Sequence, residues 1–289
     1  MILQALRAEL LKMSRNRWST FWAYGFPPAF SLIAGLIVQF VVRLPAGAEM
    51  FNAAAPISSV RDGLATYSGL FLQIFPIAGA AILFAGEYRW ETWRAILTRN
   101  GRTSIMIAKL IAFVIAAVLS IIACGLAGLV IGLVDASQAA TIVWPKADNG
   151  QIALSLAMSF AGAFLQLMST AGLVMILAVL SRAIIAAIVG PFLILSVAEI
   201  ASIRFRLPDY RDWAPLFPNL ASDAIQQVSH SMIGNSGATL SDLARSAMGG
   251  ADAYAQKLAP LGAAALVFWA VALTTTAIFV FRAQDLSKE

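Results

Sequence analysis

Few side chains of this sequence have the types and spacing that catalysis or metal binding requires. His230 is the only histidine and Cys124 the only cysteine, and neither has partners at the spacing of a metal site. The apolar runs contain no zinc-binding pair, no serine–histidine pair and no pair of aspartates. The chain also lacks the G-x-x-x-x-G-K-[ST] loop that binds ATP phosphates. We therefore expect no metal, no cofactor and no enzymatic activity in this chain.

Polar side chains inside the apolar runs are the next candidates, because an ionisable group inside a membrane indicates function. They are candidates for lining a pathway: Gln39, Gln73, Gln166 and Glu199. For Glu199 a structural role is the alternative, since its carboxylate can pair with Arg204 or Arg43.

Basic residues gather in residues 85–110, AGEYRWETWRAILTRNGRTSIMIAKL. Trp90, Trp93 and Leu97 share one side of a helix at this spacing, and Gly101 is suited to end it. The pattern predicts a short amphipathic helix. Its polar side either serves a protein partner or carries the basic residues and tryptophans typical of a membrane boundary.

The composition indicates that these residues belong to a membrane protein. Hydrophobic residues make up 60% of the 289 residues and charged residues 12%, and the mean hydropathy is +0.80. A water-soluble fold needs a polar exterior that this chain cannot supply. We assign the net charge of +5 to loops at the membrane surface rather than to nucleic-acid binding.

Six apolar runs are long enough to cross about 30 Å of hydrocarbon as helices. They lie at residues 20–42, 64–86, 104–133, 152–180, 183–203 and 260–281. Pro76 and Pro191 should kink the second and fifth of these spans. Small residues at helical spacing, among them Gly128 in the third run and Ser159 in the fourth, permit close helix packing. The sequence thus predicts one all-α membrane domain over residues 1–289.

The distribution of basic residues predicts the orientation. Lysine and arginine are divided twelve to eight between the two sides of six spans, and the richer side marks the cytoplasm. Both termini are then cytoplasmic.

Two further segments do not span the membrane. Residues 1–17 form an amphipathic helix that either lies on the inner membrane surface or extends the first span. Residues 204–259 are expected outside, where prolines give way to short, weakly amphipathic helices over 219–233 and 241–258.

A family resemblance rests on residues between the second and third runs. They follow the order Gly86, Glu87, Thr92, Arg94, Ile96, Leu97, Thr98, Arg99, Arg102 and Lys109. This order resembles the permease subunits of ABC-2 type transporters. The six runs, the amphipathic start, the long connection before the last run and the ending FRAQDL are similar to that family over the whole chain. Glu91 and Asn100 depart from the family pattern, which usually has Gly and Pro at these positions.

The resemblance implies a coupling helix within residues 85–103 that docks on a separate cytosolic ABC ATPase, which binds ATP and Mg²⁺. It further implies a dimer with a second copy or a related permease, in contact with lipid in a bacterial cytoplasmic (inner) membrane. The residues it assigns to ATPase coupling are Glu87, Arg89, Trp90, Glu91, Thr92, Trp93, Arg94, Leu97 and Arg99. The expected function is ATP-driven export of an amphiphilic or hydrophobic substrate such as a peptide, drug or lipid.

Two alternatives to a permease remain. A non-transporting scaffold would use residues 1–17 and 85–103 to dock cytosolic proteins. An ion-coupled secondary transporter would show paired ionisable groups near the middle of the membrane, where this chain has little besides Glu199. Copurification of an ATPase separates the permease from the scaffold.

Overall fold

The computed structural model describes residues 2–43, 53–89, 101–139, 141–142, 144–145, 147–205, 216–233 and 252–284. Its N-terminal third comprises α1 (Ile2–Arg15), α2 (Arg17–Thr20), η1 (Phe21–Gly25), α3 (Phe26–Ile37), η2 (Val38–Arg43), β1 (Ala53–Ala54), α4 (Pro56–Leu64), η4 (Ala65–Ser68) and α5 (Leu70–Arg89). The remainder comprises α7 (Arg102–Gln138), β2 (Thr141–Ile142), α8 (Asn149–Ser181), α9 (Ile184–Phe205), α10 (Pro218–Ile233) and α12 (Asp252–Ala283). Within these residues the two short strands pair in parallel, and everything else with regular structure is helical.

The long helices confirm an all-α membrane protein. Five helical stretches in the described parts of the chain have the length and apolarity to cross a membrane: Arg17–Val41, Leu70–Tyr88, Arg102–Gln138, Asn149–Ser181 and Ala259–Ala283. The predicted fifth run, 183–203, corresponds to α9, of which Ile184–Ala198 is a shorter apolar helix. Six spans therefore remain a prediction.

The second span begins later than the sequence predicts. The chain forms α4 and the 3-10 turn η4, and Gly69 then adopts an extended conformation with ψ of 137°. Only after this break does α5 start, at Leu70. Apolarity alone placed the start at residue 64, because it carries no information about a local break in the backbone.

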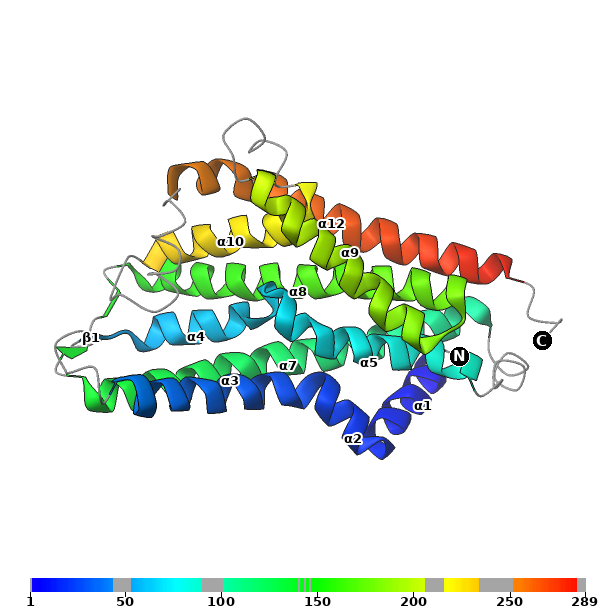
Figure 1. Cartoon of the computed structure of the whole chain (residues 1–289), viewed down its shortest axis with the longest axis horizontal. Helices are drawn as coiled ribbons and strands as arrows, with labels where there is room; N and C mark the ends of the chain where they lie inside the picture. The colour runs from blue at the N-terminus through cyan, green and yellow to red at the C-terminus, as the bar shows by residue number, and fades with distance from the viewer. Residues whose placement is uncertain are drawn as a thin grey trace.

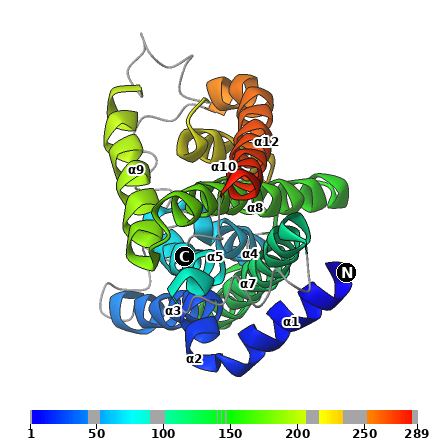
Figure 2. The ribbon, with the colours of Figure 1, turned by 90° about the vertical axis from the view of Figure 1, so that its right-hand side faces the viewer.

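The two longest helices, α7 and α8, run the length of the bundle, and the other helices pack against them (Figure 1). α4 and α5 follow one another alongside α7 and α8, α3 lies against α7, and α10 and α12 lie against α8. The core between them contains large side chains from several helices, including Phe84, Phe113, Met175 and Phe281. α1 and the C-terminal end of α12 lie at the same end of the bundle, which faces the viewer in Figure 2. We call this the termini end.

Close backbone contact joins α4 to α7. A Cβ atom added to Gly128 would lie 2.1 Å from the carbonyl oxygen of Ser59, so only glycine fits there. This confirms the close packing predicted for the third run and identifies α4 as the helix that approaches.

Candidate functional site

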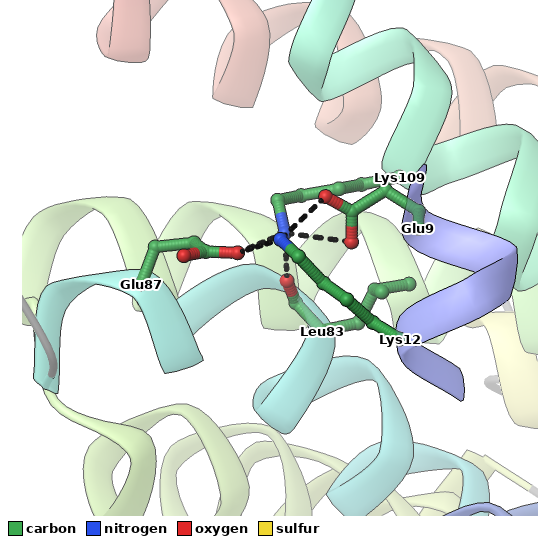
Figure 3. A network of polar contacts seen from close by, with 5 residues as sticks. All are labelled: Glu9, Lys12, Leu83, Glu87 and Lys109. Carbon is green, nitrogen blue, oxygen red and sulfur yellow. Dashed lines mark hydrogen bonds and ion pairs between the residues drawn. The ribbon is translucent and has the colours of Figure 1, made fainter. Parts of the chain in front are cut away.

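Four charged side chains from three helices meet at the termini end (Figure 3). The Nζ atom of Lys109 in α7 lies 3.1 Å from Glu9 Oε2 of α1 and 3.2 Å from Glu87 Oε1 of α5, and it donates to the Leu83 carbonyl oxygen at 2.8 Å. Lys12 of α1 joins the same carboxylates, with Nζ 2.5 Å from Glu87 Oε1 and 3.1 Å from Glu9 Oε1. We call Glu9, Lys12, Glu87 and Lys109 the charge cluster.

The charge cluster is graded from buried to exposed. The side chain of Lys109 is 1% exposed and that of Glu9 5%, whereas the side chain of Lys12 is 49% exposed. Two positive and two negative charges balance within it, which is the condition under which charges are tolerated away from water. Removal of one buried partner would leave an uncompensated charge, so the cluster holds α1, α5 and α7 together.

Local helix chemistry explains why the two lysines are needed. Glu87 lies in the last turn of α5, where the helix dipole disfavours a negative charge. The positive charges of Lys12 and Lys109 offset that unfavourable effect on Glu87. The same contacts change the pKa of Lys12. Burial lowers the pKa of Lys12, but its hydrogen bond to Glu87 and the charges of Glu9 and Glu87 outweigh burial, so the pKa is raised above 10.5.

Residues 90–100 lie between the end of α5 and the start of α7. A second set of polar contacts holds the start of α7. Arg102, the first residue of α7, donates from Nη1 to the carbonyl oxygens of Arg282 at 3.0 Å and Gln284 at 2.5 Å, at the C-terminal end of α12. A cation is favourable at that end of a helix. Gln284 also accepts from the Tyr88 hydroxyl at 2.9 Å and donates to the Val179 carbonyl oxygen of α8 at 2.5 Å. We call Tyr88, Arg102 and Gln284 the α12 clamp.

The predicted coupling residues divide between described and undescribed parts of the chain. Glu87 is in the charge cluster, and Arg89 is the last residue of α5, its side chain being outside the described part. The others lie outside the described residues: Trp90, Glu91, Thr92, Trp93, Arg94, Leu97 and Arg99. The structure therefore shows how both flanks of the segment are held.

Two of the four predicted pathway residues are buried in the bundle interior. Gln73 of α5 and Gln166 of α8 are fully buried. The Thr170 hydroxyl lies 3.4 Å from Gln73 Oε1 and 2.9 Å from the backbone carbonyl oxygen of Gln166, one turn earlier in α8. The side chain of Gln166 instead donates from Nε2 to Asn219 Oδ1 of α10 at 2.5 Å. Gln39 is half-buried in η2, and Glu199 lies in α9 with its side chain outside the described part. The Gln73 side chain thus contacts α8 through Thr170, and the Gln166 side chain contacts α10 through Asn219.

Sequence reasoning missed several polar groups. Glu9 lies at the edge of the apolar side of α1. A carboxylate at that position is the feature of the sequence that indicates a buried polar contact. Arg61 of α4 is 2% exposed, with Nη2 2.6 Å from Asp62 Oδ1, in a region assigned to a loop between spans. α10 packs on α8 partly through hydroxyl groups, with Ser229 Oγ 2.6 Å from Ser159 Oγ.

In the parts of the chain that the structure describes, no three His, Cys, Asp or Glu side chains are grouped to hold a metal ion. The site is thus a set of ion pairs and hydrogen bonds between helix ends, an arrangement that fixes helices relative to one another. Comparison of the chain with protein-family models and with curated proteins found no match.

Proposed function

We propose that this chain is the permease subunit of an ABC-2 type transporter, which exports an amphiphilic or hydrophobic substrate with energy from a separate ATPase. The observation that supports this most is the fixation of both flanks of residues 90–100. Glu87 before the segment joins α1 and α7, and Arg102 after it joins α12. A segment gripped by a moving partner would pass its displacement to four helices.

The mechanism requires that the flanks move as one body, because a flexible attachment would absorb the displacement. The charge cluster and the α12 clamp supply this rigidity, because each contains a residue of α5 before the segment and a residue of α7 after it. Closure of the ATPase on ATP would then shift α5 and α7 together with α1 and α12. The same shift would reach Gln73 in α5, and so its contact with Thr170 of α8.

In this proposal the termini end faces the cytoplasm and the chain pairs with a second copy or a related permease. The ATPase binds ATP and Mg²⁺. Residues 85–103 contact the ATPase, with Arg94 and Arg99 as the candidate ion-pair partners of its surface. Because the carboxylate of Glu87 is bound to Lys12 and Lys109, we assign it to holding the segment from within the chain.

The test is reconstitution of the chain with the ATPase that copurifies with it. Arg99→Glu should lower transport per ATP hydrolysed by about tenfold or more, because a charge that meets a partner becomes repulsive. Arg15→Glu in α1, an exposed position, is the matched control. Equal transport per ATP in the two variants, or the absence of any copurifying ATPase, would contradict the proposal and leave a scaffold as the better account.

A further inference from the structure

The turn between α8 and α9, at the termini end, contains a backbone conformation that its residue does not favour (Figure 1). Arg182 follows the last residue of α8 with φ of 56° and ψ of 17°, which is the left-handed region. Among the residues that the structure describes, it is the one non-glycine residue with a positive φ. Glycine or asparagine usually occupies such a position after a helix, because a larger side chain is strained there. The stability of the turn therefore gives no reason for an arginine.

The contacts that shape the turn do not involve the guanidinium. The backbone N–H of Arg182 donates to the Ala178 carbonyl oxygen at 3.0 Å, and Ser181 Oγ accepts from the N–H of Ala183 at 3.3 Å. Both contacts would remain with glycine at position 182. The side chains of residues 181–183 are exposed. A strained residue at an exposed position indicates that its side chain has a function.

Two further arginines lie beside this turn, around the α12 clamp. The charge of Arg182 acts on the hydroxyl of Tyr88, which donates to Gln284. Arg102 donates to the carbonyl oxygens of Arg282 and Gln284, and Arg282 itself is exposed. Three positive charges thus gather where the ends of α8 and α12 meet the start of α7. The surface they form suits a negatively charged partner.

The surface next to the turn indicates the class of that partner. Leu180 and Ile185, on either side of the turn, are 61% and 76% exposed, and Phe279 of α12 is 71% exposed. Large apolar side chains exposed to this degree mark the surface that contacts hydrocarbon. Arginines that follow such residues at a helix end reach the headgroups of the membrane. Arg182 is two residues from Leu180 and therefore lies at the headgroup level, where its partner is a lipid.

We infer that the turn between α8 and α9 binds the phosphate of an anionic phospholipid through Arg182. A guanidinium donates to two phosphate oxygens at once, which a glycine or asparagine at this position could not do. Arg102 and Arg282 add positive charge beside the site, so a headgroup with a net negative charge, such as phosphatidylglycerol, binds better than one that carries its own cation. The bound lipid offsets the strain of the left-handed residue and fixes the turn at the membrane surface.

The first experiment is thermal unfolding of the delipidated full chain in dodecyl maltoside, a detergent without phosphate. Without lipid, Arg182→Gly should raise the unfolding temperature by about 2–4 °C, because it relieves the strained conformation. Arg182→Lys, which keeps both the strain and the charge, should unfold as the unaltered chain does. A lower unfolding temperature for Arg182→Gly would show that the side chain supports the clamp within the chain, and would overturn the inference.

The second experiment adds dioleoylphosphatidylglycerol to the same samples. The lipid should raise the unfolding temperature of the unaltered chain and of Arg182→Lys, because it binds the folded form. Arg182→Gly should need about fivefold more lipid for half of the effect, as expected for one basic residue at an anionic surface. Arg15→Gln, which removes an exposed arginine of α1, is the matched control and should respond as the unaltered chain does. Equal responses of Arg182→Gly and the unaltered chain would overturn the inference.

Further additions separate the possible partners. Dioleoylphosphatidylcholine, which carries its own cation, and inorganic phosphate, which lacks the lipid chains, should each stabilise the unaltered chain less than dioleoylphosphatidylglycerol at equal concentration. An equal effect of either one would overturn the inference. Loss of a copurifying ATPase from Arg182→Gly with an unchanged response to lipid would assign Arg182 to a protein partner, and would overturn it as well. The lipid measurements need no ATPase, so their failure would leave the proposed transport function untouched.

Discussion

Of the side chains in the charge cluster, Lys109 contributes most to the electrostatic stability of the cluster. Its ammonium is buried and has three acceptors on two other helices: Glu9 Oε2, Glu87 Oε1 and the Leu83 carbonyl oxygen. The sequence drew attention to Lys109 and Glu87 through their place in a family pattern. It gave no reason to pair them with Glu9, because a contact across 100 residues depends on how α1 folds back on α7.

Replacement of Lys109 by methionine should destabilise the chain by about 3–5 kcal/mol, since two carboxylates would be left with Lys12 alone. Thermal unfolding in detergent measures the effect. Arg15→Met, at an exposed position of α1, should change stability by less than about 0.5 kcal/mol.

The triple variant Glu9→Gln, Glu87→Gln, Lys109→Met separates charge from packing. Because none of these three positions then carries a charge, the triple variant should recover most of the stability that Lys109→Met loses. A triple variant as unstable as Lys109→Met alone would show that the lost packing, and not the ion pair, is responsible.

The stability supplied by Lys12 should depend on pH in the alkaline range. Its pKa is raised in the folded chain above the ordinary 10.5, so its contribution is complete below about pH 10.5 and is lost as the pH rises through the folded value. The difference in unfolding temperature between the unaltered chain and Lys12→Gln should be constant from about pH 8 to 10 and shrink above that range. A difference that grows with alkaline pH would contradict the assignment.

Among the elements, α4 shows what a hydropathy pattern omits. Apolar length predicted the long helices well, because the free energy of burial in lipid depends on composition over about 20 residues. It did not predict that Pro56–Leu64 would fold back as a helix along α7, nor the extended Gly69 that separates η4 from α5. Those features depend on backbone contacts such as that of Gly128 with Ser59.

Gly128→Ala should therefore force α4 away from α7 and cost about 1–3 kcal/mol, as overpacking does. Gly86→Ala in α5 is the matched control, because nothing lies within 4 Å of a Cβ added there. That substitution should leave stability unchanged or raise it by up to about 1 kcal/mol. Equal unfolding temperatures for the two alanine variants would show that α4 is not held as described.

For the whole molecule, the structure and the sequence agree on an all-α membrane protein whose two ends of chain, α1 and the end of α12, share one end of the bundle. The predicted pathway residues were harder to place. Gln73 contacts α8 through Thr170, a residue without a signal of its own, because threonine is common in membrane helices and its partner is set by packing. The orientation of the bundle in the membrane and the sixth span stay predictions.

The central claim is that residues 90–100 bind an ATPase, and site-directed crosslinking tests it most directly. In a Cys124→Ala background, a photoactivatable thiol reagent is attached to Trp93→Cys in the segment or to Thr141→Cys in β2 at the opposite end of the bundle. We predict an adduct between position 93 and a protein that contains an ATP-binding phosphate loop, and none from position 141. An adduct from position 141 alone, or labelling of position 93 by a membrane-impermeant reagent in intact cells, would contradict the account.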